Sequence, residues 1–178
     1  AHYQATTQRA YSALQAMPIP TIAMVRGYCI GGGTAVAVCC DIRICTENAK
    51  FGVPAARLGL GYEYDGVQKL MDVVGPSFAK EIFFTARQFT AQEAVTMGLV
   101  NRTVADDRLE SYVREYAATI AANAPLTVAS IKSIVAEALK DDGERDMALC
   151  EQVVDRCFNS ADYVEGRPAF MEKRKPVF

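Results

Sequence analysis

Histidine is almost absent from this chain of 178 residues, and the single example, His2, lies close to the first residue. Histidine is the usual general base of enzymes and the usual central member of Ser-His-Asp and Cys-His arrangements. Neither arrangement has a histidine to work with here unless sequence outside this chain supplies one. We expect His2 itself to be a solvated terminal residue.

A large net charge and a long apolar run are also missing. The 19 Lys and Arg residues are nearly balanced by 21 Asp and Glu residues, which gives a formal net charge of -2. This balance predicts no basic face for nucleic acid. No segment approaches the roughly 18 consecutive apolar residues that span a membrane, so we expect no membrane partner either. The chain is long enough for one domain with a sizeable core.

The six cysteines contain no Cys-x-x-Cys pair, and no histidine accompanies them at the spacing of zinc ligands. A redox or metal site is one interpretation of them. The other is that they are small buried hydrophobic residues of a protein in the reducing cytosol. We favour the second interpretation and expect a cytoplasmic protein without a metal site. The cysteines are Cys29, Cys39, Cys40, Cys45, Cys150 and Cys157.

Strand and helix patterns alternate in the first part of the chain. Residues 4–16 have helical spacing, and residues 21–27 form a short apolar run that suits a buried strand. In residues 41–47 the side chains alternate, with Ile44 on one face and Arg43 on the other, which predicts another strand. The AKFGVP segment that follows is a further extended piece. This succession is typical of an α/β fold.

Turn and capping signals divide the next part of the chain into helices. A Gly-Pro pair separates two predicted helices at residues 66–74 and 77–86. Thr90 followed by Glu93 predicts a capping box at the start of another helix. Gly98 suits the position just after the end of that helix.

Residues 106–178 have only helical periodicity, so we expect a helical region there, after an α/β core in residues 1–105. The boundary between them is a change of element type and not a linker. Three apolar stripes at helical spacing predict three helices, each with an apolar face that needs a partner. The stripes are Leu109, Tyr112, Val113, Tyr116 and Ile120; Val128, Ile131, Val135 and Leu139; and Met147, Cys150, Val154, Cys157 and Phe158.

Three consecutive glycines, Gly31, Gly32 and Gly33, lie between an apolar run and a segment of small residues. One glycine inside a helix costs about 1 kcal/mol relative to alanine, so three together need a reason. They could form a tight strand-to-helix turn with positive φ, or expose N–H groups at a helix N-terminus to an anion or oxyanion. Their spacing matches neither the dinucleotide fingerprint nor a P-loop.

The motifs around these glycines favour the oxyanion interpretation. The GYCIGGG turn, the CDIR strand, the AKFGVP segment and the TAQEAVTMGLVN helix stand in the order and spacing of the crotonase superfamily, the enoyl-CoA hydratase/isomerase family. The chain resembles that family over essentially its whole length, and the terminal AFMEKRKPVF is similar to the family's closing helix and tail. The resemblance implies an α/β crotonase (ClpP-like) spiral of repeated ββα units, followed by a helical trimerisation region. We expect the N-terminal third of the family's fold to be absent here.

The resemblance also implies a substrate and an oxyanion hole. In the family, the carbonyl of an acyl-CoA thioester lies between two backbone N–H groups, and the second belongs to the middle glycine, here Gly32, next to Gly31. Negative charge on the carbonyl oxygen grows as an enolate forms, so these donors favour the transition state. Coenzyme A arrives as part of the substrate, and no separate cofactor is implied.

Two catalytic positions of the family's hydratases hold alanine in this chain. The hydratase glutamates lie three residues after the middle glycine and directly after the FGxP segment, which correspond to Ala35 and Ala55. A methyl group cannot transfer a proton, so we do not expect the protein to have ordinary hydratase activity. We expect Ala35 and Ala55 to line the substrate site. A non-catalytic acyl-CoA-binding protein is therefore an alternative to an enzyme.

The segment Tyr62, Glu63, Tyr64 and Asp65 is the candidate replacement for the lost acids. The family's aroyl-CoA dehalogenases have a catalytic aspartate in a similar loop, which aligns best with Glu63. A carboxylate there could act as base or nucleophile, and the Tyr62 hydroxyl could donate a proton to an enolate, as a decarboxylase relative would require. A decarboxylase, thioesterase or dehalogenase-like enzyme that uses residues 62–65 is therefore a further alternative. Alternatively, both acids are solvated, Asp65 caps the next helix, and Tyr62 and Tyr64 line the acyl pocket.

Near the C-terminus, Phe170 and Lys173 match family positions that contact the CoA of a neighbouring subunit. Lys173 would face a phosphate as a point charge. The alternative is a solvated basic cluster of Lys173 with Arg174 and Lys175. The resemblance implies a homotrimer or a dimer of trimers, which would give the apolar helical stripes a partner.

Overall fold

The computed structural model describes the backbone of residues 2–178 and the side chains from residue 6 onward. These residues form two compact units. The first ends at Val113, and the second contains Pro18–Pro20 and Arg114–Phe178. The expectation for the His2 side chain lies outside the described residues.

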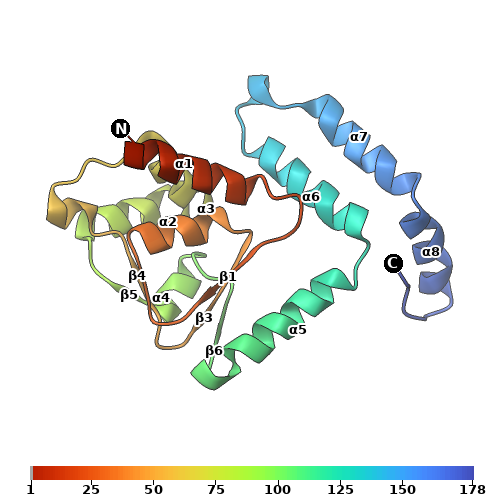
Figure 1. Ribbon diagram of the computed structural model, residues 1–178, viewed down its shortest axis with the longest axis horizontal. Coiled ribbons are helices and arrows are strands. Elements are labelled where there is room, and N and C mark those ends of the chain that lie inside the picture. The colour runs from red at the N-terminus through yellow and green to blue at the C-terminus, as the bar shows by residue number, and fades with distance from the viewer. Residues whose placement is uncertain (1) are drawn as a thin grey trace. The chain divides into compact units, whose positions relative to one another are not determined.

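The six strands form two three-stranded sheets, and the first four strands alternate between them along the chain (Figure 1). The strands are β1 (Ile22–Val25), β2 (Tyr28–Ile30), β3 (Ile42–Thr46), β4 (Lys50–Gly52), β5 (Phe89–Thr90) and β6 (Arg102–Val104). One sheet has the order β1–β3–β6 and is parallel, while the other has the order β2–β4–β5 with β5 antiparallel to β4. The pairs β1–β2 and β3–β4 are each followed by a helix, so the ββα repeat expected for a spiral is present.

Helices pack on these strands in the first unit and make up most of the second. The first unit contains α1 (His2–Gln15), α2 (Gly32–Cys39), α3 (Tyr64–Thr85), α4 (Ala91–Thr96) and the 3-10 turns η1 (Ala55–Leu58) and η2 (Asp106–Arg108). Helix α5 (Leu109–Ala121) leads into the second unit, which contains α6 (Pro125–Ala138), η3 (Asp142–Glu144), α7 (Met147–Phe158) and α8 (Ala161–Met171). The three helices predicted from the apolar stripes are therefore confirmed as α5, α6 and α7.

Strand β3 is predicted as a strand with two different faces, and the structure buries both of them. Arg43 is only 6% exposed, and Ile44 and Cys45 are fully buried. The Arg43 guanidinium donates hydrogen bonds to the carbonyl oxygens of Leu99 and Cys40, both at 2.7 Å. Because these carbonyls replace water around the charge, Arg43 can be buried beside the C-terminal end of α2. Burial still lowers the pKa of Arg43 from its usual value.

The local signals in residues 75–98 are confirmed. Helix α3 is broken at Gly75, where φ is +75°, just before Pro76. The Thr90 hydroxyl accepts a hydrogen bond from the Glu93 N–H, and the Glu93 carboxylate accepts one from the Thr90 N–H at 2.7 Å. Gly98 has φ of +75° after the end of α4. Strands β2 and β5 were not predicted, because three and two residues are too few to establish an alternation.

The cysteines agree with the interpretation of small hydrophobic residues. Cys29, Cys39 and Cys45 are buried, and none of the six forms a disulfide in the described part of the chain. Burial raises the pKa of the Cys45 thiol to about 11, which keeps this thiol protonated at neutral pH. Within residues 2–178, no group of three or more potential metal ligands is found.

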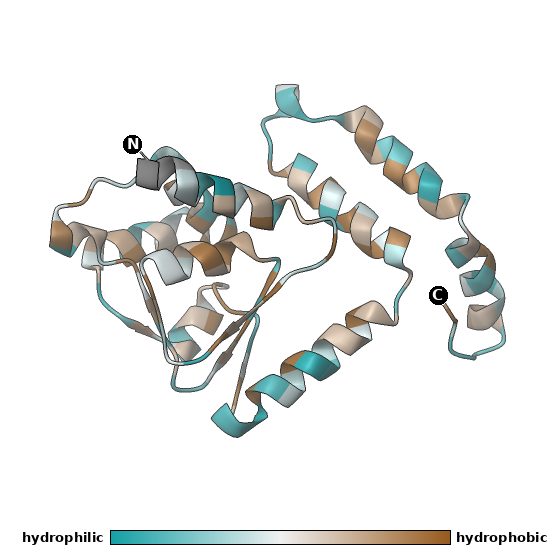
Figure 2. Ribbon diagram, viewed as in Figure 1, coloured by the Kyte–Doolittle hydropathy of each residue, from teal (hydrophilic) through white to brown (hydrophobic). Residues whose placement is uncertain are grey.

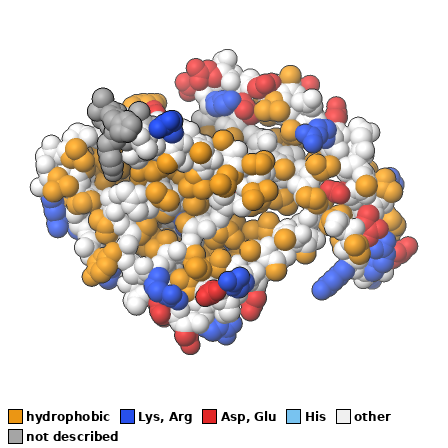
Figure 3. All heavy atoms as spheres, viewed as in Figure 1, with side chains coloured by type: hydrophobic (Ala, Val, Ile, Leu, Met, Phe, Trp, Pro, Cys, Tyr) orange, Lys and Arg blue, Asp and Glu red, His pale blue; other side chains and the backbone are white. Residues whose placement is uncertain are grey.

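Among the described helices, no single one has both the length and the apolar composition to cross a membrane. One bent pair, Asp106–Ala121 with Pro125–Ala138, meets that test jointly, by length and composition only. In the second unit, apolar and polar positions alternate along α6 and α7 (Figure 2). Ile131 and Val135 of α6 and its C-cap residue Leu139 are more than half exposed, and Figure 3 shows many hydrophobic side chains at the visible surface.

The capping box generates a pH-dependent prediction. The pKa of Glu93 is lowered to about 2 by the hydrogen bond from the Thr90 N–H and by Arg87, whose guanidinium lies 2.8 Å away. A folded-state pKa below the unfolded value means that ionised Glu93 stabilises the fold above pH 4.5, and that this stabilisation is lost as pH falls towards 2. We expect Glu93→Gln to reduce the free energy of unfolding by about 0.5–1 kcal/mol at pH 7, discounted for its exposure.

Chemical denaturation from pH 7 to pH 2 measures this difference. The gap between wild type and Glu93→Gln should shrink below pH 4.5, where the wild-type carboxylate begins to bind protons in the unfolded state. Glu47→Gln removes an exposed carboxylate outside the box and serves as the control. A gap that stays constant over the whole pH range would contradict the assignment.

Candidate functional site

The glycine triplet forms the junction between β2 and α2. Gly31 is the N-cap of α2 and has φ 57° and ψ -113°. Residues other than glycine rarely adopt a backbone conformation with this positive φ. Its N–H donates to the Gly52 carbonyl at 2.8 Å, and its carbonyl accepts the Ala35 N–H at 3.0 Å. A Cβ on Gly31 would lie 3.9 Å from Pro54, an ordinary contact. Backbone conformation, and not crowding, therefore explains the first glycine.

Gly32 and Gly33 are explained differently. Neither has positive φ, both are exposed, and a Cβ built on Gly32 would meet no atom within 4 Å. Their N–H groups lie in the first turn of α2, before the first i to i-4 hydrogen bond, which Ala35 donates. The positive end of the helix dipole therefore lies at an exposed residue, Gly32, that has no side chain to cover it. The turn therefore combines the two interpretations of the glycines. Gly31 provides the positive φ of a tight strand-to-helix turn, and Gly32 leaves the N-terminus of α2 open to a ligand.

Thr34 is a polar residue that sequence analysis did not single out. It is 2% exposed, and its hydroxyl donates to the Cys29 carbonyl at 2.6 Å and lies 3.2 Å from the Gly52 carbonyl. Thr34 could have been noticed in the sequence, because it is the single residue of α2 with a hydroxyl group, among glycines and apolar residues. Its hydrogen bonds tie the first turn of α2 to both β2 and β4.

The two alanines lie on different elements of the first unit. Ala35 is half-buried within α2, and Ala55 is buried as the first residue of η1, where its carbonyl accepts the Leu60 N–H at 3.0 Å. Helix α3 packs against both α2 and η1. The glycine turn, the two alanines and the segment that leads into α3 therefore lie on neighbouring elements. Neither alanine provides a group that can bind or release a proton.

Tyr62 is half-buried and packs beneath α3. Its ring lies 4.8 Å from the ring of Phe83, and Gly66 gives it room, because a Cβ on Gly66 would come within 2.6 Å of the Tyr62 ring. Burial, with a smaller contribution from Tyr11, raises the pKa of Tyr62. The phenol is therefore protonated at neutral pH and is able to donate a hydrogen bond or a proton.

Glu63, Tyr64 and Asp65 begin α3 and are exposed, Tyr64 to 78%. Helix α3 starts at Tyr64, with Glu63 as its N-cap residue, so the expectation that Asp65 caps a helix starting near Gly66 is wrong. The helix begins earlier because the Glu63 carbonyl accepts the N–H groups of both Gly66 and Val67. Asp65 instead accepts a hydrogen bond from the Gln8 side chain of α1 at 3.0 Å.

Phe170 and Lys173 belong to the second unit. Phe170 is 82% exposed, and Lys173 is exposed with a left-handed φ of 55° just beyond α8. Lys173, Arg174 and Lys175 are all exposed, and the Arg174 guanidinium also pairs with Glu165 at 2.6 Å and with Glu172 at 2.7 Å. The pKa of Glu165 is accordingly lowered to about 2. Arg174, next to Lys173 in the chain, therefore has two carboxylate partners, Glu165 and Glu172.

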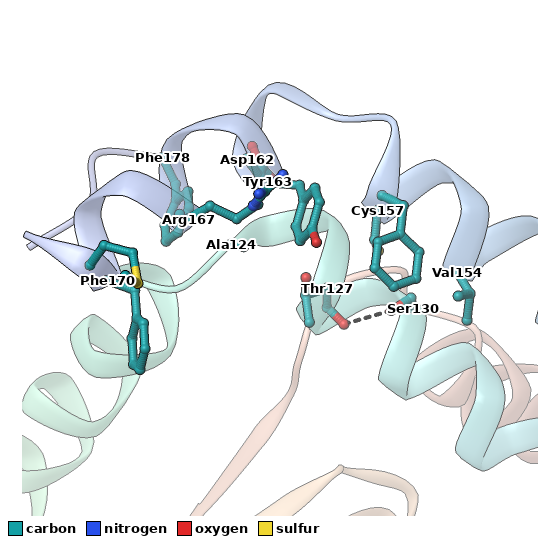
Figure 4. Close-up of a pocket in the computed structure, with 13 residues that line it drawn as sticks. Ala124, Thr127, Ser130, Val154, Cys157, Asp162, Tyr163, Arg167, Phe170 and Phe178 are labelled. Carbon is teal, nitrogen blue, oxygen red and sulfur yellow. Dashed lines mark hydrogen bonds between the residues drawn. The ribbon is translucent and has the colours of Figure 1, made fainter.

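A cavity of about 760 Å³ lies within the second unit, between α6, α7, α8 and the C-terminal residues (Figure 4). Its lining is mostly apolar and includes Phe170 and Phe178. The Arg167 guanidinium, also at the lining, lies 5.5 Å from the centre of the Tyr163 ring. The C-terminal residue is thus part of a wall that α8 and the tail build together.

The alternating ββα architecture and the glycine turn at the start of α2 define a protein of the crotonase fold. The chain belongs to the enoyl-CoA hydratase/isomerase family, whose sequence model matches residues 1–178. It is 38% identical to crotonyl-CoA hydratase of Syntrophomonas wolfei, over 99% of this chain and 68% of that protein. It is 36% identical to short-chain-enoyl-CoA hydratase of Clostridium acetobutylicum, over 94% of this chain and 64% of that protein.

Solved structures confirm the predicted fold. An enoyl-CoA hydratase/carnithine racemase from Magnetospirillum magneticum superposes with a TM-score of 0.92 at 38% identity, covering 99% of this chain and 66% of that one. An enoyl-CoA hydratase from Bacillus anthracis superposes with a TM-score of 0.91 at 32% identity, covering 99% and 69%. The chain spans about two thirds of the length of these relatives.

The different roles of the first two glycines are testable by stability. Gly31→Ala should lower the free energy of unfolding by about 1–3 kcal/mol, because alanine is strained in the Gly31 conformation. Gly32→Ala should leave it unchanged or raise it by up to about 1 kcal/mol, because Gly32 is helical and has open space around its Cα. Urea denaturation measures both. Equal destabilisation by the two variants would show that crowding, which the structure does not contain, governs the turn.

Proposed function

We propose that this protein binds acyl-CoA thioesters and stabilises a thioester enolate at the N-terminus of α2, with the Gly32 N–H as a donor to the thioester oxygen. The observation that carries the proposal is that Gly32 is exposed in the first turn of α2, at the positive end of the helix dipole, and that a Cβ built on it would meet no atom within 4 Å. Relatives named as hydratases of CoA thioesters support this substrate class. One oxyanion donor of this kind contributes about 3–4 kcal/mol to transition-state stabilisation.

The reaction proposed is not ordinary hydration, because Ala35 and Ala55 occupy the positions of the two hydratase glutamates. Glu63 and Asp65 are the carboxylates proposed to act as base or nucleophile, and the protonated Tyr62 phenol is proposed as a proton donor to the enolate. Tyr64, together with Gly31 and the two alanines, is proposed to contact the acyl group. A dehalogenase-, decarboxylase- or thioesterase-like reaction fits these roles. Binding of acyl-CoA without catalysis is the alternative.

We further propose that the protein works as a homotrimer or a dimer of trimers in the cytoplasm. The exposed apolar face of α6 at Ile131, Val135 and Leu139 supports association, and the absence of disulfides among the six cysteines supports a reducing compartment. In such an assembly Phe170 and Lys173 would contact the CoA bound by a neighbouring subunit. No cofactor other than the CoA of the substrate is proposed.

Calorimetric binding and turnover assays on the full-length protein test the proposal. The panel contains crotonyl-CoA, malonyl-CoA and an aroyl-CoA. We expect binding of at least one thioester, weakened by Gly32→Ala because the new methyl group occupies the space of the carbonyl oxygen. Gly143→Ala is the matched control, since Gly143 also has nothing within 4 Å of a built Cβ but lies in η3. Failure of every thioester to bind would reject the proposal.

Two carboxylate variants separate the enzyme from the binding protein. If Glu63 or Asp65 carries the reaction, Glu63→Gln or Asp65→Asn should reduce turnover by about 100-fold or more and leave thioester affinity within about threefold. Tight binding without turnover across the panel would instead support the non-catalytic alternative. Turnover that survives both substitutions would remove the segment at residues 62–65 from the mechanism.

The missing glutamates allow a gain-of-function prediction. The double variant Ala35→Glu/Ala55→Glu should hydrate crotonyl-CoA at least about 100 times faster than the wild type, because general acid–base catalysis contributes about this much. The control is Ala35→Gln/Ala55→Gln, which has similar volume without a titratable group. Ala55 is buried, so the unfolding midpoint of both variants is measured alongside. Equal rates for the two double variants would contradict the assigned positions.

A further inference from the structure

The first turn of α2 is fixed at both ends to one backbone carbonyl. The Gly52 oxygen, at the end of β4, accepts the Gly31 N–H at 2.8 Å and lies 3.2 Å from the Thr34 hydroxyl. Between these two anchors stand Gly32 and Gly33, which have no side chains. A Cβ built on Gly32 would meet no atom within 4 Å, and one built on Gly33 would meet the Cys29 sulfur at 3.8 Å, an ordinary contact.

The Thr34 hydroxyl also joins the turn to the neighbouring strand. Its shorter hydrogen bond, 2.6 Å, is donated to the Cys29 carbonyl in β2. Strands β2 and β4 are parallel partners, and Cys29 pairs with Phe51, the residue before Gly52. One buried hydroxyl therefore reaches both strands of the sheet that supports the turn.

The carbonyl that anchors the turn is itself held firmly. A Cβ on Gly52 would lie 2.7 Å from the Arg87 carbonyl, so the two backbones are in close contact. Arg87 in turn pairs with Glu81 of α3 at 3.1 Å and with Glu93 of α4 at 2.8 Å. The neighbouring backbone therefore fixes the position of the Gly52 oxygen. The Thr34 hydroxyl, which is directed at this oxygen, holds the first turn of α2 in place relative to it.

We infer that Thr34 is a positioning residue, whose hydroxyl sets the direction of the Gly32 N–H for the thioester oxygen. This inference rests on the proposed function. Thr34 does not contact the ligand, because it is buried and its hydroxyl is directed at the strands. It acts through the two glycines, whose N–H groups precede the first i to i-4 hydrogen bond of α2 and have no intrahelical partner. A misplacement of about 1 Å in an active site can cost about 100-fold in rate.

Three variants of the full-length protein test the inference. Thr34→Val keeps the shape of the side chain and removes the hydroxyl, while Thr34→Ser keeps the hydroxyl. Thr46→Val is the matched control, because Thr46 is a fully buried threonine of β3 whose hydroxyl bonds to Asn48 at 2.6 Å. Thr46→Val therefore loses a buried hydroxyl without touching the turn. Urea denaturation first confirms that all variants are folded.

The ligand readout is polarisation of a bound thioester carbonyl, measured as the red shift of the absorbance of cinnamoyl-CoA on binding. We expect Thr34→Val to lose most of the red shift while its dissociation constant rises by less than about threefold, since the direction of one N–H changes more than the total contact. Thr34→Ser and Thr46→Val should retain the shift. A full shift in Thr34→Val, or an equal loss in Thr46→Val, would overturn the inference.

A second readout requires no ligand. Amide hydrogen exchange at Gly31 reports the bond to the Gly52 oxygen, and it should accelerate at least about tenfold in Thr34→Val but not in Thr34→Ser or Thr46→Val. If the wild type binds cinnamoyl-CoA without a red shift, the proposed role of the Gly32 N–H is wrong, and accelerated exchange would still support the role of Thr34 in holding the turn. Unchanged exchange in Thr34→Val would reject that role whether or not thioesters bind.

Discussion

The Gly52 carbonyl oxygen is the point on which the first unit depends. It accepts the Gly31 N–H and lies within reach of the Thr34 hydroxyl, so the end of β4 determines where α2 begins. The other end of α2 is fixed by Arg43, whose buried guanidinium binds the Cys40 carbonyl and reaches Leu99 before β6. An eight-residue helix is too short to be stable alone, and these hydrogen bonds at both ends give it a defined position.

The features that sequence could predict are those that depend on neighbouring residues. The capping box of Thr90 and Glu93 and the break at Gly75 follow from conformational preferences of a few residues, and the structure has both. The motif resemblance supplied the ββα spiral, which local patterns gave only as an α/β succession. The start of α3 was misplaced by two residues, because helix boundaries depend on which carbonyl accepts the first N–H groups.

The features that sequence could not predict depend on contacts between distant residues. Arg43 can be buried because Leu99, 56 positions away, provides a carbonyl for its guanidinium. The spacing of the glycines predicted the place of the turn, but not that Gly31 needs its unusual φ and ψ while Gly32 does not. Thr34 was overlooked for the same reason, since its partner at Gly52 belongs to the next repeat of the spiral.

The hydrogen bond between Gly31 and Gly52 has a consequence for the order in which the protein is made. Synthesis proceeds from the N-terminus, so the glycine turn leaves the ribosome before the strand that fixes it. Until β4 has emerged and paired with β2, the Gly31 N–H and the Thr34 hydroxyl lack the carbonyl that they share in the folded protein. The turn therefore reaches its final conformation only once the second repeat has been made. In each nascent chain it lacks these hydrogen bonds for the time needed to synthesise the residues from Thr34 to Gly52.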